Sequence, residues 1–340
     1  MSLRTHALAF ALAIAAAASG CTRSELRDAG GRAVTQGSMQ VQLTFTRIGP
    51  GQDARDVQFD GQAHFARYAA TDAELVPTLL GVASDDDIPL DTCRAIDSAD
   101  ALDRALDAVD PTVGVELLDA GRLAVRGPDD ATALVAKHYP ELTPYVAGVV
   151  YGADDALPLA LEPGAVYEVA GEGGEEIGPF QVQAQAPRAF PSLEAPVLRR
   201  GSDLELRWTE AGEVSEPMVL VVAWSARAGV RGGVSEVRCR VRDDGSFAVP
   251  RELLAAMPAP SRLTGAEVSA QRTRRSSVAV LGARRGSGFE RFDGALRVVL
   301  REVVPLPVSA WPLAGTGGAV PSVRSGAVHD GPRALDEVRR

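Results

Sequence analysis

Acidic side chains are the most abundant residues of this chain that could hold a metal ion. Asp85 begins a run of three aspartates, and Asp100, Asp103 and Asp107 share one face of a short expected helix. Calcium takes about six to eight oxygen ligands of this kind. Neither group has the spacing of an EF-hand loop, and aspartates beside glycine ordinarily serve turns. We therefore expect a solvated acidic surface, no metal site and no cofactor.

Residues for nucleophilic or hydrolytic catalysis are scarce. The chain has 4 histidines, no His-x-x-x-His or His-Glu-x-x-His pair, and no Gly-x-Ser-x-Gly elbow. Zinc hydrolases and α/β-hydrolases depend on such patterns. With 45 acidic residues, no particular carboxylate pair can be singled out for glycoside hydrolysis. We predict no catalytic residues and a protein that is not an enzyme, and an envelope hydrolase with a dispersed site stays open as an alternative.

The main local cationic feature is a group of three arginines, Arg272, Arg274 and Arg275. Guanidinium groups bind carboxylates and phosphates in a bidentate manner. The chain carries a formal charge of −10, and no aromatic residues alternate with these arginines, so we expect no nucleic-acid partner. The group is predicted to be a solvated hairpin surface, or alternatively a contact to an anionic envelope partner.

The N-terminus has the pattern of a secretory signal peptide. Arg4 precedes an uninterrupted apolar run at Ala7–Ala18, and Ser19 and Gly20 follow as small residues. A positive start, a short apolar core and a small-residue exit are typical of such peptides. The run is shorter than the roughly 20 residues that a membrane-spanning helix needs.

Residues 18–21, Ala-Ser-Gly-Cys, resemble the lipobox of bacterial lipoproteins, although the commonest first residue is Leu. The resemblance implies that residues 1–20 are removed and that Cys21 carries a diacylglycerol on its thiol and an acyl chain on its amine. Several chains anchor a protein stably, whereas one chain binds a membrane only marginally. Thr22 stands where Asp would imply retention in the inner membrane, which implies the outer membrane, with its face left open.

Two further cysteines, Cys93 and Cys239, lie in different halves of the chain. An even number of cysteines in an oxidising compartment permits a disulfide. Such a bond would join the two halves, and free buried thiols are the alternative.

Alternating or continuous apolar runs predict many short strands. These strands are expected at residues 39–45, 59–68, 115–118, 123–125, 145–151, 166–170, 180–185, 204–208, 218–224, 237–241, 247–249, 266–280 and 295–304. Asp119–Arg122 and the glycine-rich segment Gly171–Gly178 are predicted to be hairpin turns, since no helix follows the glycines to bind a phosphate. Short helices are expected between residues 99 and 109 and at Pro250–Met257.

These elements predict a mainly β fold with two β-rich, immunoglobulin-like sandwich domains and one or two short helices. Prolines at residues 187–196 suggest a connector, and the unpatterned end suggests disorder. The predicted organisation is a signal peptide at 1–20, a tether at 21–38, a β-rich domain at 39–190, an immunoglobulin-like sandwich at 191–305 and a disordered tail at 306–340.

Several turn and strand motifs resemble a group of uncharacterised outer-membrane lipoproteins of myxobacteria and related bacteria. The resemblance covers roughly residues 113–260. It is carried by Gly171–Gly178, Phe180, Trp208, Cys239, Phe247–Pro250, Leu253, Leu254, Met257 and Pro258. The group implies a fold and a cell location, and it has no activity to carry over.

Together the sequence predicts a lipid-anchored envelope protein that acts as a non-enzymatic binding module. The membrane, through the lipid on Cys21, and an envelope protein or glycan are the expected partners. Loops at the ends of sandwich domains commonly bind such partners. A structural spacer without a ligand is the second possibility.

Overall fold

The computed structural model describes ten ranges of the chain. They are residues 35–49, 57–69, 85–96, 115–143, 146–153, 159–199, 201–211, 216–226, 235–283 and 289–307. The predicted signal peptide, Cys21, most of the tether, the helix between residues 99 and 109 and nearly all of the tail lie outside these ranges.

Strands make up most of the described chain, together with one short α-helix, α4, and one 3-10 turn, η3. The elements are β1 Thr35–Ile48, β2 Val57–Ala69, β3 Thr92–Ile96, β4 Val115–Leu117, β5 Leu123–Arg126, β6 Ala131–Thr143, β7 Val146–Ala153, β8 Val166–Gly171, β9 Phe180–Gln185, β10 Leu204–Arg207, β11 Met218–Ala226, β12 Glu236–Val241, β13 Ser246–Val249, α4 Arg251–Leu254, η3 Pro260–Arg262, β14 Leu263–Ala283 and β15 Phe289–Pro305. The predicted mainly β, sandwich-like fold is confirmed.

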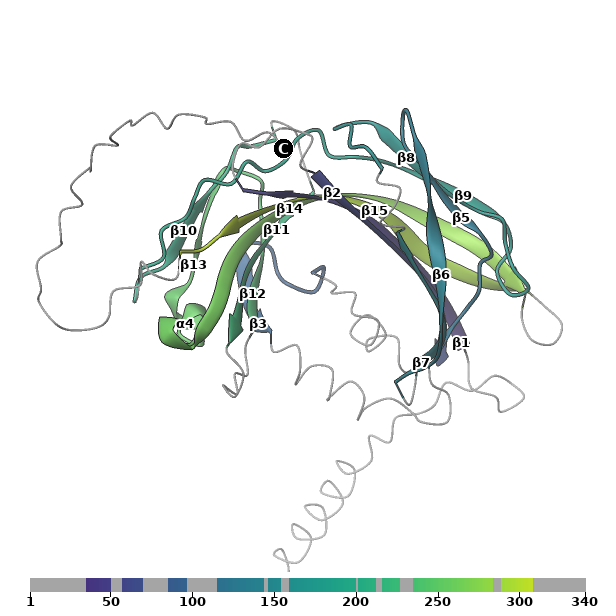
Figure 1. Cartoon of the computed structure of the whole chain (residues 1–340), viewed down its shortest axis with the longest axis horizontal. Helices are drawn as coiled ribbons and strands as arrows, with labels where there is room; N and C mark the ends of the chain where they lie inside the picture. Colours follow the sequence, from purple (N-terminus) through teal and green to yellow (C-terminus); the bar gives the residue numbers. More distant parts are fainter. Residues whose placement is uncertain are drawn as a thin grey trace, which may run out of the picture.

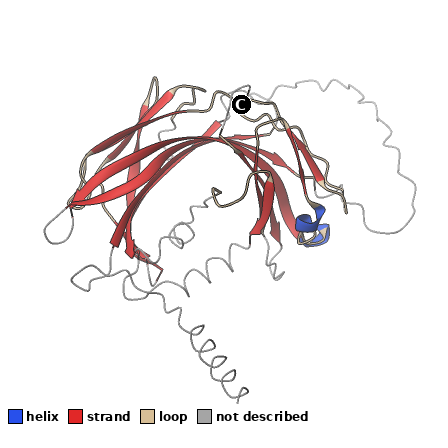
Figure 2. Cartoon of the chain, turned by 180° about the vertical axis from the view of Figure 1, so that it is seen from behind, coloured by secondary structure: helices blue, strands red, loops and turns tan. Residues whose placement is uncertain are grey.

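Thirteen of the strands form one continuous sheet in the order β3-β12-β11-β14-β15-β1-β2-β4-β7-β6-β5-β8-β9. Its long central strands bend into an arch, with β10, β13 and α4 outside one flank and β5, β8 and β9 outside the other (Figures 1 and 2). β1 joins the strands of the two halves of the chain into one sheet, because it pairs in parallel with β15 on one side and antiparallel with β2 on the other. The arch therefore has an outer face covered by two layers and an inner, concave face.

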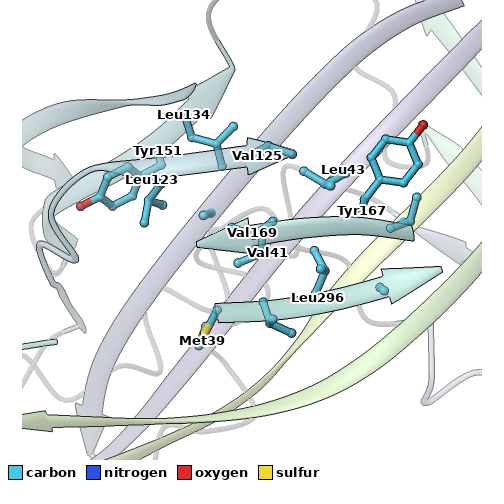
Figure 3. Close-up of a cluster of buried hydrophobic side chains, with 14 of the residues drawn as sticks. Met39, Val41, Leu43, Leu123, Val125, Leu134, Tyr151, Tyr167, Val169 and Leu296 are labelled. Carbon is cyan, nitrogen blue, oxygen red and sulfur yellow. The ribbon is translucent and has the colours of Figure 1, made fainter. Parts of the chain in front are cut away.

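Two hydrophobic cores lie under the outer layers. The first packs odd-numbered side chains of β1 and β2, such as Met39 and Leu43, against β5, β6, β8 and β9 (Figure 3). The second packs β11, β12 and β14 against β10, β13 and α4, and it contains Trp208 and Trp224. The strands β14 and β15 contribute side chains to both cores, and Cys93 and Ala95 of β3 pack against the second core.

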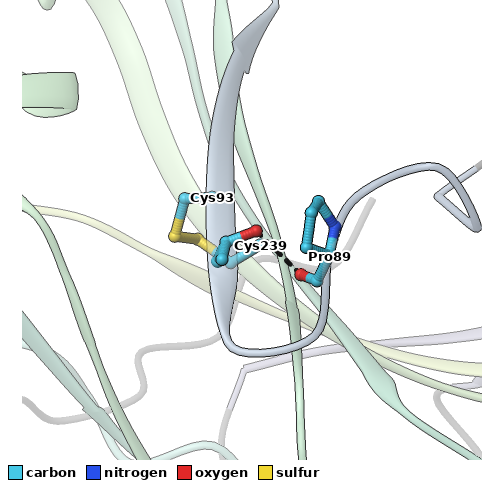
Figure 4. The surroundings of a disulfide bond; sticks show 4 residues. Pro89, Cys93 and Cys239 are labelled. Carbon is cyan, nitrogen blue, oxygen red and sulfur yellow. Dashed lines mark hydrogen bonds between the residues drawn. A yellow bond between two sulfur atoms is a disulfide. The ribbon is translucent and has the colours of Figure 1, made fainter.

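Cys93 and Cys239 form a disulfide between β3 and β12 (Figure 4). The two residues are direct partners in the antiparallel register of these strands. The two cysteines are 146 residues apart, so the bond fixes β3 and the segment before it to β12, a strand of the second half of the chain. This is the link between the two halves that the cysteine positions suggested.

Three expectations about local structure need correction. Residues 115–118 and 123–125 do not form a hairpin, because β4 pairs with β2 and β7 while β5 pairs with β6 and β8. Asp119 lies in the segment between β4 and β5 and accepts hydrogen bonds from the Tyr151 hydroxyl at 2.7 Å and the Gly121 amide at 2.8 Å. These bonds fix the segment that connects the two strands. The predicted tether is too long, since β1 begins at Thr35. The strands β3 and β6 were not predicted.

Other expectations are met. Residues 171–178 connect β8 and β9, which pair as an antiparallel hairpin, so the glycine-rich segment is a hairpin loop as predicted. Gly173 has a φ of 87°, a conformation that side-chain-bearing residues rarely adopt. Among the described helices, none combines the length and the apolar character that crossing a membrane requires.

Candidate functional site on the concave face

The concave face carries a polar cavity of about 370 Å³. Strand alternation explains its polarity: odd-numbered residues of β1 and β2 enter the first core, so even-numbered residues such as Gln40 and Gln62 face the arch interior. The lining residues are Ser38, Met39, Gln40, Val41, Gln42, Gln62, His64, Asp85, Arg238, Gln271, Thr273, Arg275, Asp293, Gly294, Ala295, Arg297, Val299 and Arg301. Four arginines against two aspartates make this lining cationic in a chain whose overall charge is −10.

One row of polar side chains crosses four neighbouring strands of the cavity. Arg275 of β14 is the register partner of Arg297 of β15, and Arg297 is the partner of Gln42 of β1. Gln42 is in turn the partner of Gln62 of β2. With neighbouring strands about 4.8 Å apart, the row is roughly 14 Å long. It presents guanidinium groups at one end and amides at the other.

An acidic segment before β3 reaches this face. Asp85 contacts Arg238 at 3.2 Å, and Asp86 contacts Arg275 at 3.1 Å and Arg297 at 3.5 Å. Burial raises the pKa of Asp85, and the neighbouring Arg238 opposes that effect.

The third aspartate of this segment, Asp87, is exposed and contacts both guanidinium nitrogens of Arg94, at 2.8 and 3.3 Å. Its hydrogen bonds with Arg94 lower the pKa of the Asp87 carboxyl. All three aspartates thus contact arginines; Asp86 and Asp87 are exposed, whereas Asp85 is largely buried and does not fit the predicted solvated surface. Within the described ranges, no group of three or more His, Cys, Asp or Glu residues is arranged to hold a metal ion.

The predicted arginine group does not form a single surface. Arg272 is buried, with 4% of its side chain exposed, and its Nε and Nη2 donate to the two carboxylate oxygens of Asp243 at 2.7 and 2.8 Å. Arg272 also donates to the carbonyls of Phe190 and Thr209, so it ties the two halves together and is closed to a partner.

The other two arginines point to opposite faces of β14, because adjacent residues of a strand alternate. Arg274 shares the face of Arg272, and Arg275 lines the concave cavity. Of the three arginines proposed to contact an anionic partner, only Arg275 therefore belongs to the candidate site.

His64 is the histidine of the concave face. Only 7% of it is exposed, and burial lowers its pKa below the usual 6.5. His138 lies on β6 with its side chain exposed. The pKa of the Asp119 carboxyl is lowered, first by its hydrogen bond from the Tyr151 hydroxyl. His64 lines the concave cavity, whereas His138 is not among the lining residues.

The lowered pKa of His64 gives a pH-dependent stability. In the unfolded chain His64 takes up a proton near pH 6.5, whereas in the folded chain it stays neutral to a lower pH. The folded state therefore loses stability relative to the unfolded state as the pH falls below about 6.5. Each unit by which the folded pKa is lowered is equivalent to about 1.4 kcal/mol. We expect melting temperatures measured from pH 7.5 to 5.5 to fall less for His64→Gln than for the wild type. The matched variant His138→Gln should keep the wild-type slope, and equal slopes for all three proteins would contradict this role of His64.

Large aromatic side chains, which commonly anchor ligands, lie in the cores at four described Trp and Tyr positions. Trp208 and Trp224 are each only 6% exposed, and Tyr151 and Tyr167 are fully buried. Apart from Arg275 and Asp85, the polar residues of the candidate site were not among the candidates predicted from the sequence. The alternation Gln40-Val41-Gln42 was visible in the sequence. The sequence did not show that β1 pairs in parallel with β15, and this pairing is what brings Arg275 and Arg297 to the same face as Gln42 and Gln62.

No family model and no curated protein matches this chain. Solved structures with some similarity are β-rich. The Fcho1 Mu homology domain from Danio rerio, with a bound Eps15 peptide, has 11% identity and a TM-score of 0.22, and the match covers 80% of this chain and 97% of that one. The FN1–FN3 domains of chicken CNTN1 have 14% identity and a TM-score of 0.13, covering 56% of this chain and 60% of that one. At these TM-scores and identities the comparisons assign no family to this chain.

Proposed function

We propose that the chain is a lipid-anchored protein of the bacterial outer membrane that binds a polar envelope ligand on its concave face, without catalysing a reaction. The observation that carries the binding function is the row formed by Arg275, Arg297, Gln42 and Gln62. Two buried cores hold this row rigidly, and rigid scaffolds that present polar groups in a concavity are typical of binding sites. The lipid anchor rests on the lipobox-like residues that end at Cys21.

A capture experiment tests the binding function. Wild-type protein would be immobilised and exposed to solubilised native envelopes, and retained components would be quantified by mass spectrometry. We expect Gln42→Lys combined with Gln62→Lys to reduce the specifically retained components at least about tenfold, since two bulky cations would disrupt the amide end of the row.

The matched control is Gln181→Lys combined with Gln183→Lys. These two glutamines are exposed on β9, outside the arch, and contact Glu168. Their replacement should leave retention unchanged. Equal losses in both double variants, or no loss in either, would contradict a concave binding face.

A structural spacer is the second candidate. The burial of Trp208 and Trp224 favours it, because exposed tryptophans are frequent anchors of binding interfaces. A spacer would retain nothing that depends on Gln42 and Gln62, so the capture experiment separates the two functions.

The anchor is tested by Cys21→Ala. The wild type should fractionate with the outer membrane and incorporate labelled palmitate, because several acyl chains give stable binding where one does not. The variant should lose both properties and appear in the soluble fraction. A variant that stays in the membrane fraction would show that the lipoprotein assignment is wrong.

A further inference from the structure

Two like charges face each other in the concave sheet. Arg275 and Arg297 are direct register partners on antiparallel strands, a placement that is destabilising unless an anion lies between the charges. The anion is the carboxylate of Asp86, whose Oδ2 accepts from both guanidinium groups, at 3.1 and 3.5 Å. The pair of arginines is therefore a carboxylate site that the chain fills with its own side chain.

The contact of Asp86 is loose, although the segment that carries it is fixed. The Asp86 and Arg275 side chains are 59% and 45% exposed, and exposed ion pairs contribute about 0–1 kcal/mol. On either side, Asp85 is held by Arg238, and Ile88 is only 1% exposed. The disulfide of Cys93 anchors the same segment to β12. Asp86 can thus leave the arginines by a side-chain rotation while the segment stays in place.

From this arrangement we infer that Arg275 and Arg297 form the recognition site for an acidic peptide segment of a partner protein, and that Asp86 is an internal competitor that the partner's carboxylate replaces. The inference rests on the proposed binding function of the concave face. A peptide is favoured because the occupant of the site is itself an aspartate-rich peptide segment of this chain. The amide nitrogens of Gln42 and Gln62 donate to Thr44 at 3.0 Å and to Asp60 at 3.1 Å. Each amide keeps a second N–H and a carbonyl oxygen, which can hydrogen-bond to an extended backbone.

A titration with hexa-aspartate tests the inference, using fluorescently labelled peptide, the full chain and two salt concentrations. We expect Asp86→Asn to bind the peptide about threefold to tenfold more tightly than the wild type, because it removes a competing ion pair. Asp293→Asn is the matched control: Asp293 also lines the cavity, but its carboxylate contacts Arg291 instead. It removes the same charge and should change affinity less than about twofold.

Arg275→Gln, alone and with Arg297→Gln, should weaken binding at least about tenfold when the thermal unfolding transition is retained. The single variant keeps the test usable if the double variant does not fold. Equal affinities for the Asp86→Asn and Asp293→Asn variants, or binding that survives loss of the arginines, would overturn the inference.

Two further probes define the ligand class. Hexa-lysine should not bind, and oligogalacturonate, an acidic glycan, should bind more weakly than hexa-aspartate. Preference for the glycan would overturn the assignment to a peptide. If hexa-aspartate fails to bind while envelope capture still depends on Gln42 and Gln62, the inference fails and the proposed binding function stands.

Discussion

Asp243→Ala is expected to lower the free energy of unfolding by about 3–5 kcal/mol, the range found when one partner of a buried ion pair is removed. The side chain of Asp243 is 1% exposed and is the bidentate acceptor for Arg272, whose side chain is 4% exposed. Its Oδ1 also accepts from the indole nitrogen of Trp208 at 2.9 Å. The variant would leave a buried guanidinium without its counter-charge at the junction of the two cores.

Urea denaturation of the variants measures this effect. Asp293→Ala is the control, because its ion pair with Arg291 is 65% exposed on the aspartate side and should contribute less than about 1 kcal/mol. Arg272→Met combined with Asp243→Leu should recover much of the loss, since replacing both partners removes the unpaired charge. A loss below 1 kcal/mol for Asp243→Ala would mean that the pair does not hold the junction.

Removing the disulfide is expected to lower the free energy of unfolding by about 2–5 kcal/mol. Cys93 and Cys239 are 146 residues apart, and a bond that closes so long a loop restricts the unfolded chain strongly. Cys93→Ala combined with Cys239→Ala should show this loss in urea, and wild-type protein unfolded with a reductant should match the variant.

A thiol count gives the control for the disulfide. Protein carrying Cys21→Ala, denatured without reductant, should show no reactive thiol, because the two remaining cysteines are bonded. Two reactive thiols together with wild-type stability of the double variant would refute the bond.

Local patterns in the sequence predicted most strands, since their alternation is set by residues that are neighbours in the chain. β6 was missed because its exposed positions carry Ala131, Ala133 and Val135, which blur the difference between its faces. β3 was missed because none of its residues is buried, so no apolar core-facing run marks it in the sequence. The hairpin at 119–122 was predicted from its turn residues and the apolar runs on either side, whereas β4 pairs with β2 and β7, and β5 pairs with β6 and β8.

The candidate site was much harder to predict than the strands. Its row combines residues 42, 62, 275 and 297, and the parallel pairing of β1 with β15 that assembles it has no local signature. The three arginines near 272 illustrate the same point. Their closeness in sequence suggested one surface. Arg272 is buried, and the alternation of side chains along β14 places Arg274 and Arg275 on opposite faces of the sheet.

The concave face as the binding face is tested most directly by site-specific photocrosslinking in living cells. A photoreactive amino acid would replace Gln62 inside the arch, or Gln183 on the outer surface of β9, one at a time. We predict crosslinked partner species from position 62, which diminish when Arg275→Gln is added, and none from position 183. Crosslinks from position 183 alone, or none from position 62, would contradict binding at the concave face.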